Sequence, residues 1–308
     1  NWKGNIKMTL LFEGVSAAVT TPFKDGEIDL ESFKNHLQFL KDNDIQAFII
    51  NGTTGEGSTL TDSEKKQTIK TAIDVANKEI PVIATTGSNN TQASIDSSLE
   101  AKKLGVDGLL IITPYYNKTT QKGAIAHFTA IAEALVDLPI IMYDVPARTG
   151  MSLEADTVAK LSKIPNIVGL KDATGDLANL TRMQNLVTDD FAFYGGNDDI
   201  ALPFYAAGGK GLISVVANVI PSEHQKLYEL AQNNPKEAIK LNNLLFPFTD
   251  TIGTELNPIS IKAVVSHIGF GDYELRLPLV ELEDSKVTQL IHSYQSLKEG
   301  LNHLWKLY

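Results

Sequence analysis

One lysine within an apolar run is the strongest candidate for reactive chemistry in this sequence. Lys171 follows residues 167–170 (IVGL), a run typical of a buried strand. A lysine amine that is buried without a partner is favoured in its neutral form, which is the form that attacks a carbonyl carbon. Lys171 could therefore form a Schiff base with a carbonyl substrate. It could instead form an ion pair with Asp144 or Asp172, or reach solvent at the strand end.

Two further segments carry polar side chains where an apolar run ends. Tyr143 stands near the end of residues 140–145, and Arg148 lies in the segment that follows. A tyrosine here can move protons or simply pack as an aromatic ring, and an arginine can bind a carboxylate or remain a solvated charge. Thr53 and Thr54 lie in a Gly-rich segment, which is either a functional loop or a tight turn before a helix.

The composition excludes or leaves unsupported several other chemistries. The chain contains no Cys, so it has no disulfide, no Cys-ligated metal site and no thiol nucleophile. Its six His residues show no close metal-ligand spacing, and no Gly-x-x-x-x-Gly-Lys-Ser/Thr phosphate loop is present. Asp198 and Asp199 could bind a divalent ion but are more typical of a helix N-terminus. We therefore expect no cofactor and no metal ion.

Eight short apolar runs predict the elements that must position these side chains. Their starts lie 19–34 residues apart, close to the ~30 residues of a strand-and-helix unit. The runs are almost continuously apolar, as are strands buried on both faces of a parallel sheet. We predict a closed (β/α)8 TIM barrel instead of an open doubly wound sheet, because the first run lacks Gly-x-Gly-x-x-Gly. The runs are residues 14–20, 47–51, 81–86, 108–113, 140–145, 167–172, 192–196 and 211–216.

Helical patterns separate these runs and then continue alone to the end of the chain. Asp29 precedes one amphipathic segment, Thr61 and Glu64 form a capping box before another, and Gly105 marks a helix end. After the eighth run, Asn234 and the proline that follows it predict a helix start. That helix is expected to bury a stripe formed by Ile239, Leu244 and Leu245.

The patterns predict one barrel with an extension. We expect residues 8–232 to form the catalytic barrel and residues 233–308 to form a C-terminal helical region that packs on the barrel or on a neighbouring subunit. Residues 1–7 are interpreted as a remnant that precedes a natural start at Met8.

Charge narrows the range of partners. With 27 Lys and Arg against 37 Asp and Glu, the formal net charge is −10, which repels nucleic acid and anionic membranes. Small molecules and further copies of the chain are the expected partners. The first residues lack the apolar run of a signal peptide, and no stretch is long enough to span a membrane, so we expect a cytoplasmic protein.

Several segments together closely resemble the dihydrodipicolinate synthase (4-hydroxy-tetrahydrodipicolinate synthase) family, and the resemblance covers nearly the whole chain from Met8. Each segment is weak evidence alone, whereas all of them in this order and spacing are highly specific. They are residues 52–56 (GTTGE), 114–117 (PYYN), 143–150 (YDVPARTG), 169–174 (GLKDAT), 195–199 (GGNDD), 213–219 (ISVVANV), 257–259 (NPI) and 276–280 (RLPLV).

The resemblance implies a Schiff-base lyase of lysine and diaminopimelate biosynthesis. Lys171 would condense with pyruvate, and the resulting enamine would attack the aldehyde of L-aspartate 4-semialdehyde to give 4-hydroxy-tetrahydrodipicolinate. Tyr143 matches the family's proton donor and acceptor, and Thr53 and Tyr116 match the other members of its proton relay. Tyr116 reaches in from a neighbouring subunit in that family. The resemblance thus implies a homo-oligomer, either a dimer or a tetramer of two tight dimers.

The resemblance also implies which residues bind the substrates. Thr54 and the backbone around Ile213 match the pyruvate-binding positions. Arg148 matches the residue that holds the carboxylate of the semialdehyde, and Gly196 matches a position that lines the pocket.

The sequence departs from the family at a regulatory site. Members inhibited by lysine typically carry Glu at the position of Ala93 and His at the positions of Asp62 and Lys65, while Asn89 and Tyr115 are kept here. We therefore expect weak or absent inhibition by lysine.

A second departure lies beside the predicted pocket. Asp144 stands where many members have Asn. We expect its carboxylate near the pocket mouth, where it would repel an acidic substrate unless Arg148 offset the charge.

Two other functions fit parts of the pattern. A pyruvate-dependent aldolase acting on a sugar acid, similar to N-acetylneuraminate lyase, would share the lysine and the tyrosine but would typically lack an arginine at position 148. A non-catalytic barrel homologue is disfavoured because Lys171, Tyr143, Thr53 and Tyr116 are all present.

Overall fold

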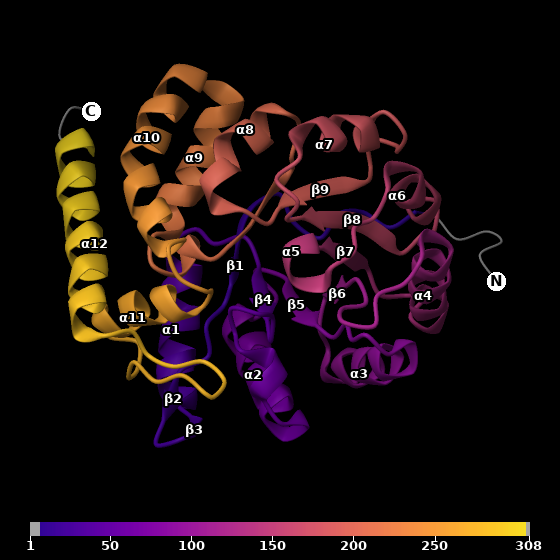
Figure 1. The fold of residues 1–308 in the computed structure, drawn as a ribbon, viewed down its shortest axis with the longest axis horizontal. Helices are drawn as coiled ribbons and strands as arrows, with labels where there is room; N and C mark the ends of the chain where they lie inside the picture. The colour runs from indigo at the N-terminus through magenta and orange to yellow at the C-terminus, as the bar shows by residue number, and fades with distance from the viewer. Residues whose placement is uncertain (1–6, 306–308) are drawn as a thin grey trace.

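The fold is a closed barrel of parallel strands (Figure 1). The computed structural model describes residues 7–305, and within them eight parallel strands close into a ring in their order along the chain. This confirms the predicted (β/α)8 barrel, and each apolar run forms one strand. The strands are β1 (Gly14–Ala18), β4 (Phe48–Ile50), β5 (Val82–Thr85), β6 (Gly108–Ile112), β7 (Ile140–Asp144), β8 (Ile167–Asp172), β9 (Ala192–Gly195) and β10 (Gly211–Ser214).

Helices surround the barrel, and the three helix ends that the sequence predicts here are confirmed. The Asp29 carboxylate accepts the Ser32 N–H at 3.0 Å, Thr61 and Glu64 form a reciprocal capping box, and Gly105 ends its helix with a φ of +95°. These helices are α1 (Leu30–Asp42), α2 (Asp62–Ala76), α3 (Thr91–Leu104), α4 (Gln121–Ala134), α5 (Pro146–Thr149), α6 (Ala155–Leu161), α7 (Leu177–Gln184) and α8 (Ala201–Ala206). A short antiparallel hairpin that the sequence did not predict, β2 (Phe23–Lys24) with β3 (Glu27–Ile28), precedes α1.

The pleat of the strands decides which side chains enter the barrel. Ile141 and Tyr143 belong to the inner apolar cluster, whereas Met142 packs in the outer cluster between the strands and the helices. Tyr143 lies opposite Lys171 in the register of β7 and β8. Both side chains therefore point into the barrel near the end at which the parallel strands finish.

Helices alone follow the last strand, as predicted. They are α9 (Pro221–Asn233), α10 (Pro235–Ile252), α11 (Ile259–His267) and α12 (Asp284–Trp305). Asn234 caps α10, with its side-chain oxygen 3.4 Å from the Glu237 nitrogen, and Leu245 is buried as expected. The prediction for Ile239 is wrong: this side chain is 52% exposed, because the buried face of α10 runs through Leu241, Leu245 and Phe248.

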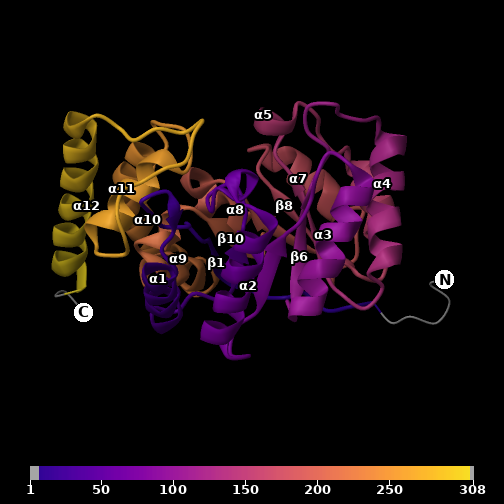
Figure 2. The same cartoon turned by 90° about the horizontal axis from the view of Figure 1, so that it is seen from below.

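The C-terminal elements lie beside the barrel. In Figure 2, α10, α11 and α12 stand to one side, and the segment between α11 and α12 reaches over the same end of the barrel as α5. The predicted boundary between residues 232 and 233 falls at the end of α9. The division into a catalytic barrel and a helical region remains a prediction.

The described chain begins at Lys7, so the remnant predicted over residues 1–7 lies outside the described residues except for its last member. The Lys7 ammonium donates to the carbonyl oxygens of Ser162, Ile164 and Ile167 at 2.5, 3.1 and 2.6 Å. Among residues 7–305, none of the helices has both the length and the apolar character that crossing a bilayer requires.

Candidate active site

Lys171 lies inside the barrel, as its place in an apolar run predicts. Its side chain is on β8, the residue is 8% exposed, and its Nζ atom lies 4.1 Å from the centroid of the Tyr143 ring. The face of an aromatic ring attracts a positive charge, so Tyr143 is placed to stabilise a cation on this nitrogen. The structure thus brings together the two residues that the sequence singled out as nucleophile and proton carrier.

Asp144 and Asp172, the alternative partners of Lys171, bind other groups. Asp144 accepts hydrogen bonds from the Ser152 hydroxyl at 2.9 Å and the Leu153 N–H at 3.0 Å, and Asp172 accepts from the N–H and hydroxyl of Thr174 at 2.8 and 2.6 Å. Each aspartate follows an inward-pointing residue in its strand, so its side chain faces outward. The proposed ion pair of Lys171 is therefore replaced by the contact with Tyr143.

The expectation that Asp144 faces the pocket mouth is wrong. Its carboxylate is buried on the outer side of β7, against the segment that joins α5 to α6. Burial raises the pKa of Asp144 to about 6, the hydrogen bonds from Leu153 and Ser152 oppose that rise, and the charge of Asp172 adds to it. One of its two oxygens, Oδ1, is buried without a hydrogen-bond partner.

Thr53 and Thr54 lie in the loop after β4, at the same end of the barrel as Lys171. The Thr53 carbonyl accepts the Glu56 N–H at 3.0 Å, which closes the turn, and Thr54 is buried. The Thr54 hydroxyl accepts a hydrogen bond of 2.9 Å from the Nδ2 atom of Asn257. An oxygen that already accepts from an amide can offer its own proton to an anionic ligand.

Arg148 lies on α5, immediately after β7. Its guanidinium donates to the backbone oxygen of Asn257 at 3.3 Å. Asn257 thus contacts both predicted substrate-binding residues, Thr54 through its side chain and Arg148 through its backbone. The sequence gives only a weak signal for Asn257, which is its place in the family-like segment of residues 257–259.

Gly196 lies beside Lys171, and Ile213 belongs to the inner apolar cluster. A Cβ atom added at Gly196 would lie 2.7 Å from the Cβ of Ala173 and 3.2 Å from the Cε of Lys171, so a side chain here would press on the lysine stem. Ile213 is buried on β10 in the same inner cluster as Tyr143. Just after it, the Asp198 carboxylate accepts the N–H groups of Val215 and Val216 at 2.9 and 3.2 Å.

Tyr116, another predicted catalytic residue, lies on the surface of its own chain. It is 90% exposed, and its backbone has a φ of +67°, which is uncommon for an aromatic residue. Tyr115 beside it is also exposed. The Tyr116 side chain is thus accessible at the surface of its own chain.

The residues gathered here suit carbonyl chemistry on a carboxylic acid. They offer several polar groups at one end of the barrel: the inward-pointing amine of Lys171, the phenol of Tyr143 against it, the hydroxyls of Thr53 and Thr54, and the guanidinium of Arg148. Among residues 7–305, the His, Asp and Glu side chains form no group of three or more arranged to hold a metal ion.

Comparison with known proteins gives a consistent match. The sequence pattern of the Dihydrodipicolinate synthetase family matches residues 11–296. The chain is 53% identical over 293 residues to a 4-hydroxy-tetrahydrodipicolinate synthase of Macrococcus caseolyticus, covering 95% of this chain and 99% of that protein.

Solved structures agree with the sequence match. A dihydrodipicolinate synthase of Acinetobacter baumannii in complex with pyruvate is 39% identical, with a TM-score of 0.90 over 94% of this chain and 99% of that chain. The enzyme of Cyanidioschyzon merolae with lysine bound is 36% identical, with a TM-score of 0.91 over 94% and 99% of the two chains.

Asp144 predicts a pH-dependent stability. Because its folded pKa is raised from 3.8 to about 6, its contribution to stability is present below about pH 4 and is lost as the pH rises through about 6. Asp144→Asn removes this charge and keeps an oxygen that can accept the Leu153 N–H. We expect its free energy of unfolding, relative to the unsubstituted protein, to rise by up to about 3 kcal/mol between pH 4 and pH 7 in urea titrations. A difference that stays constant across this range would contradict the burial of an ionisable carboxyl.

Proposed function

This chain belongs to the Dihydrodipicolinate synthetase family, and from that premise we propose that Lys171 condenses with pyruvate and directs its attack on L-aspartate 4-semialdehyde. The activity is that of a 4-hydroxy-tetrahydrodipicolinate synthase, a lyase of lysine and diaminopimelate biosynthesis. The observation that carries the assignment of the nucleophile is the Lys171 amine, 4.1 Å from the Tyr143 ring centroid inside the barrel.

Each step of the proposed reaction moves a proton. The Lys171 amine adds to the C2 carbonyl of pyruvate, the carbinolamine loses water, and a proton leaves C3 to give the enamine. The enamine carbon then bonds to the aldehyde carbon of the semialdehyde, and attack of the substrate amine on C2 closes the ring and releases Lys171. Tyr143 is the proposed proton carrier, with Thr53 and Tyr116 completing the relay. The ring face of Tyr143 also favours the cationic Schiff base on the same nitrogen.

Substrate binding is assigned to residues at the end of the barrel where the parallel strands finish. Thr54, oriented by Asn257, and the backbone at Ile213 are proposed to bind the pyruvate carboxylate. Arg148 is proposed to bind the carboxylate of the semialdehyde, for which its planar guanidinium is suited. Gly196 leaves the space that the condensing substrates need beside the lysine stem.

The exposed Tyr116 supports a homo-oligomer in which each subunit completes its neighbour's relay. We propose at least a dimer, with a tetramer of two such dimers as the larger alternative. A cytoplasmic location is proposed from the reaction, because pyruvate is an intermediate of central metabolism.

Borohydride trapping tests the nucleophile. Incubation with pyruvate followed by reduction should convert the Schiff base to a stable secondary amine on the peptide that contains Lys171, as measured by mass spectrometry. Lys262 provides an internal control, because it is also buried but is held in an ion pair with Glu56. Lys171→Met should abolish both the adduct and the condensation. An adduct at another lysine, or none in the active protein, would refute the assignment.

Mixing two inactive variants tests the shared relay. Tyr116→Phe and Lys171→Ala should each be nearly inactive as pure proteins. In a mixed oligomer formed by co-expression, the site on the Tyr116→Phe subunit keeps Lys171 and receives an intact Tyr116 from its neighbour. We expect turnover to reappear in the purified mixture. Turnover no greater than the sum of the two pure variants would show that Tyr116 does not act across subunits.

Lysine is expected to inhibit weakly or not at all. The position at which lysine-inhibited members of the family carry Glu is Ala93, in the first turn of α3, and its methyl group cannot pair with an amino group. Steady-state assays with added lysine should therefore show little change in rate. Saturable inhibition in the millimolar range would contradict this expectation.

A further inference from the structure

The loop that carries Thr53 and Thr54 is held in a conformation that its own residues do not favour. Asn51 and Glu56, which flank the two threonines, have φ values of +63° and +53°. Left-handed backbone is unfavourable for residues other than glycine and persists only where the surroundings hold it in place. Hydrogen bonds from Glu56 N–H to Thr53 O and from Gly57 N–H to Gly52 O, at 3.0 and 3.1 Å, close the loop on itself.

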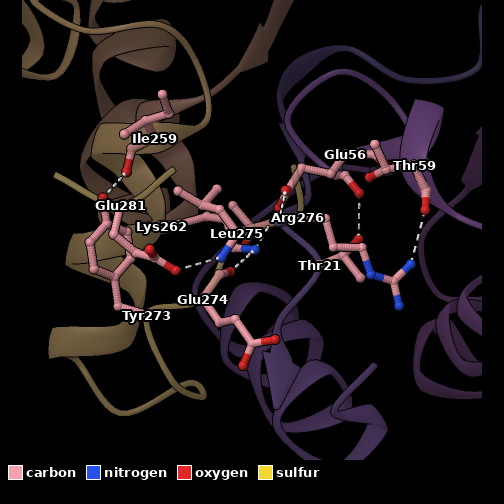
Figure 3. Close-up of polar contacts among 12 residues, drawn as sticks. Thr21, Glu56, Thr59, Ile259, Lys262, Tyr273, Glu274, Leu275, Arg276 and Glu281 are labelled. Carbon is pink, nitrogen blue, oxygen red and sulfur yellow. Dashed lines mark hydrogen bonds and ion pairs between the residues drawn. The ribbon is translucent and has the colours of Figure 1, made fainter. Parts of the chain in front are cut away.

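The Glu56 side chain connects this loop to the C-terminal region (Figure 3). Its Oε2 atom lies 2.5 Å from the Nζ atom of Lys262 on α11, and both side chains are almost fully buried, 1% and 2% exposed. Its Oε1 atom accepts the backbone N–H of Arg276 at 3.1 Å. Both oxygens of the carboxylate are therefore engaged by residues that follow the barrel in sequence.

The partners of Glu56 are themselves fixed. Lys262 also donates to the Glu274 carbonyl at 2.6 Å and lies 4.3 Å from the centroid of the Phe23 ring. The Arg276 guanidinium lies 4.3 Å from the same centroid and binds both oxygens of Glu64 at 2.8 and 2.6 Å. The cluster thus joins the loop after β4, the β2 strand, α2, α11 and the segment after α11.

A buried ion pair is an inefficient way to stabilise a core. Removing two charges from water is costly, and well-packed apolar side chains of similar size often serve stability equally well. The position of this pair suggests a different role, because Glu56 is two residues from Thr54. Asn257, just before α11, also comes from the C-terminal region, and its side chain donates a hydrogen bond to the Thr54 hydroxyl.

We propose that Glu56 and Lys262 are positioning residues for the condensation: their buried ion pair fixes the loop of residues 51–57 so that Thr53 and Thr54 meet the substrate. This inference rests on the proposed function, in which these threonines relay a proton and bind pyruvate. The C-terminal region is then part of the catalytic apparatus although it contributes no reacting group.

The test separates positioning from stability. Lys262→Met leaves the buried Glu56 carboxylate without its counterion and should lower both stability and activity. Adding Glu56→Gln removes the unpaired charge, so the double variant should recover stability measured by urea unfolding. If the ion pair positions the loop, the double variant should not recover activity. We expect kcat/KM for pyruvate to stay about 10- to 100-fold below that of the unsubstituted protein, because misplaced groups near the reacting atoms cost rates of this order, and borohydride trapping should be slower.

Two further variants complete the design. Glu56→Gln alone preserves shape and an acceptor for Arg276, so it should fold and still lose kcat/KM even if the double variant does not fold. Glu223→Gln is the matched control: it removes the 3.1 Å ion pair of Lys298 and Glu223, which joins α12 to α9 away from this loop, and should leave kcat and KM unchanged.

The outcomes are distinct. Unchanged kcat and KM in Glu56→Gln, or activity that recovers with stability in the double variant, would overturn the positioning role while leaving Lys171 as the nucleophile. Absence of a pyruvate adduct in the unsubstituted protein would refute the proposed function, and the positioning role with it.

Discussion

A parallel barrel buries both faces of its strands, so a polar group placed there is costly unless it finds a partner. The structure satisfies this constraint repeatedly. The Tyr194 hydroxyl donates to the Phe12 carbonyl at 2.6 Å, and the Asn218 amide donates to the carbonyls of Ala18 and Val215 at 2.7 and 2.9 Å where the first and last strands meet. Lys171 differs, because the neighbour of its amine is the aromatic face of Tyr143, which attracts a positive charge on the nitrogen.

The barrel and the buried position of Lys171 were predictable because their causes are local in sequence. Strands buried on both faces need continuous apolar runs, and period-two alternation turns every second side chain of a strand into the barrel. The pairing of Lys171 with Tyr143 depends in addition on the register of β7 and β8. The caps at Asp29 and Gly105 follow from the chemistry of single residues. The error at Ile239 has a local cause as well, since a helix with apolar residues on several sides does not reveal which side is covered.

The rest of the site could not be predicted because it depends on contacts between distant segments. The sequence shows that position 144 carries a carboxylate. Only the fold shows that this carboxylate faces Ser152 on the outer side of β7. Asn257 meets Thr54 across 203 residues of sequence, and Glu56 looks like an ordinary loop glutamate until Lys262 is placed beside it. Periodicity contains no information about such pairs.

The separation of Glu56 from Lys262 has a consequence for synthesis of the protein. A chain is synthesised from its N-terminus, and Lys262 follows Glu56 by 206 residues. Strands and helices of the barrel can assemble before α11 has emerged. Glu56, in the loop of residues 51–57, lacks its counterion Lys262 until then. The nascent chain therefore contains Lys171 long before it contains the partner of Glu56, and the Glu56–Lys262 ion pair can form only after the segments that follow the barrel in sequence have been synthesised.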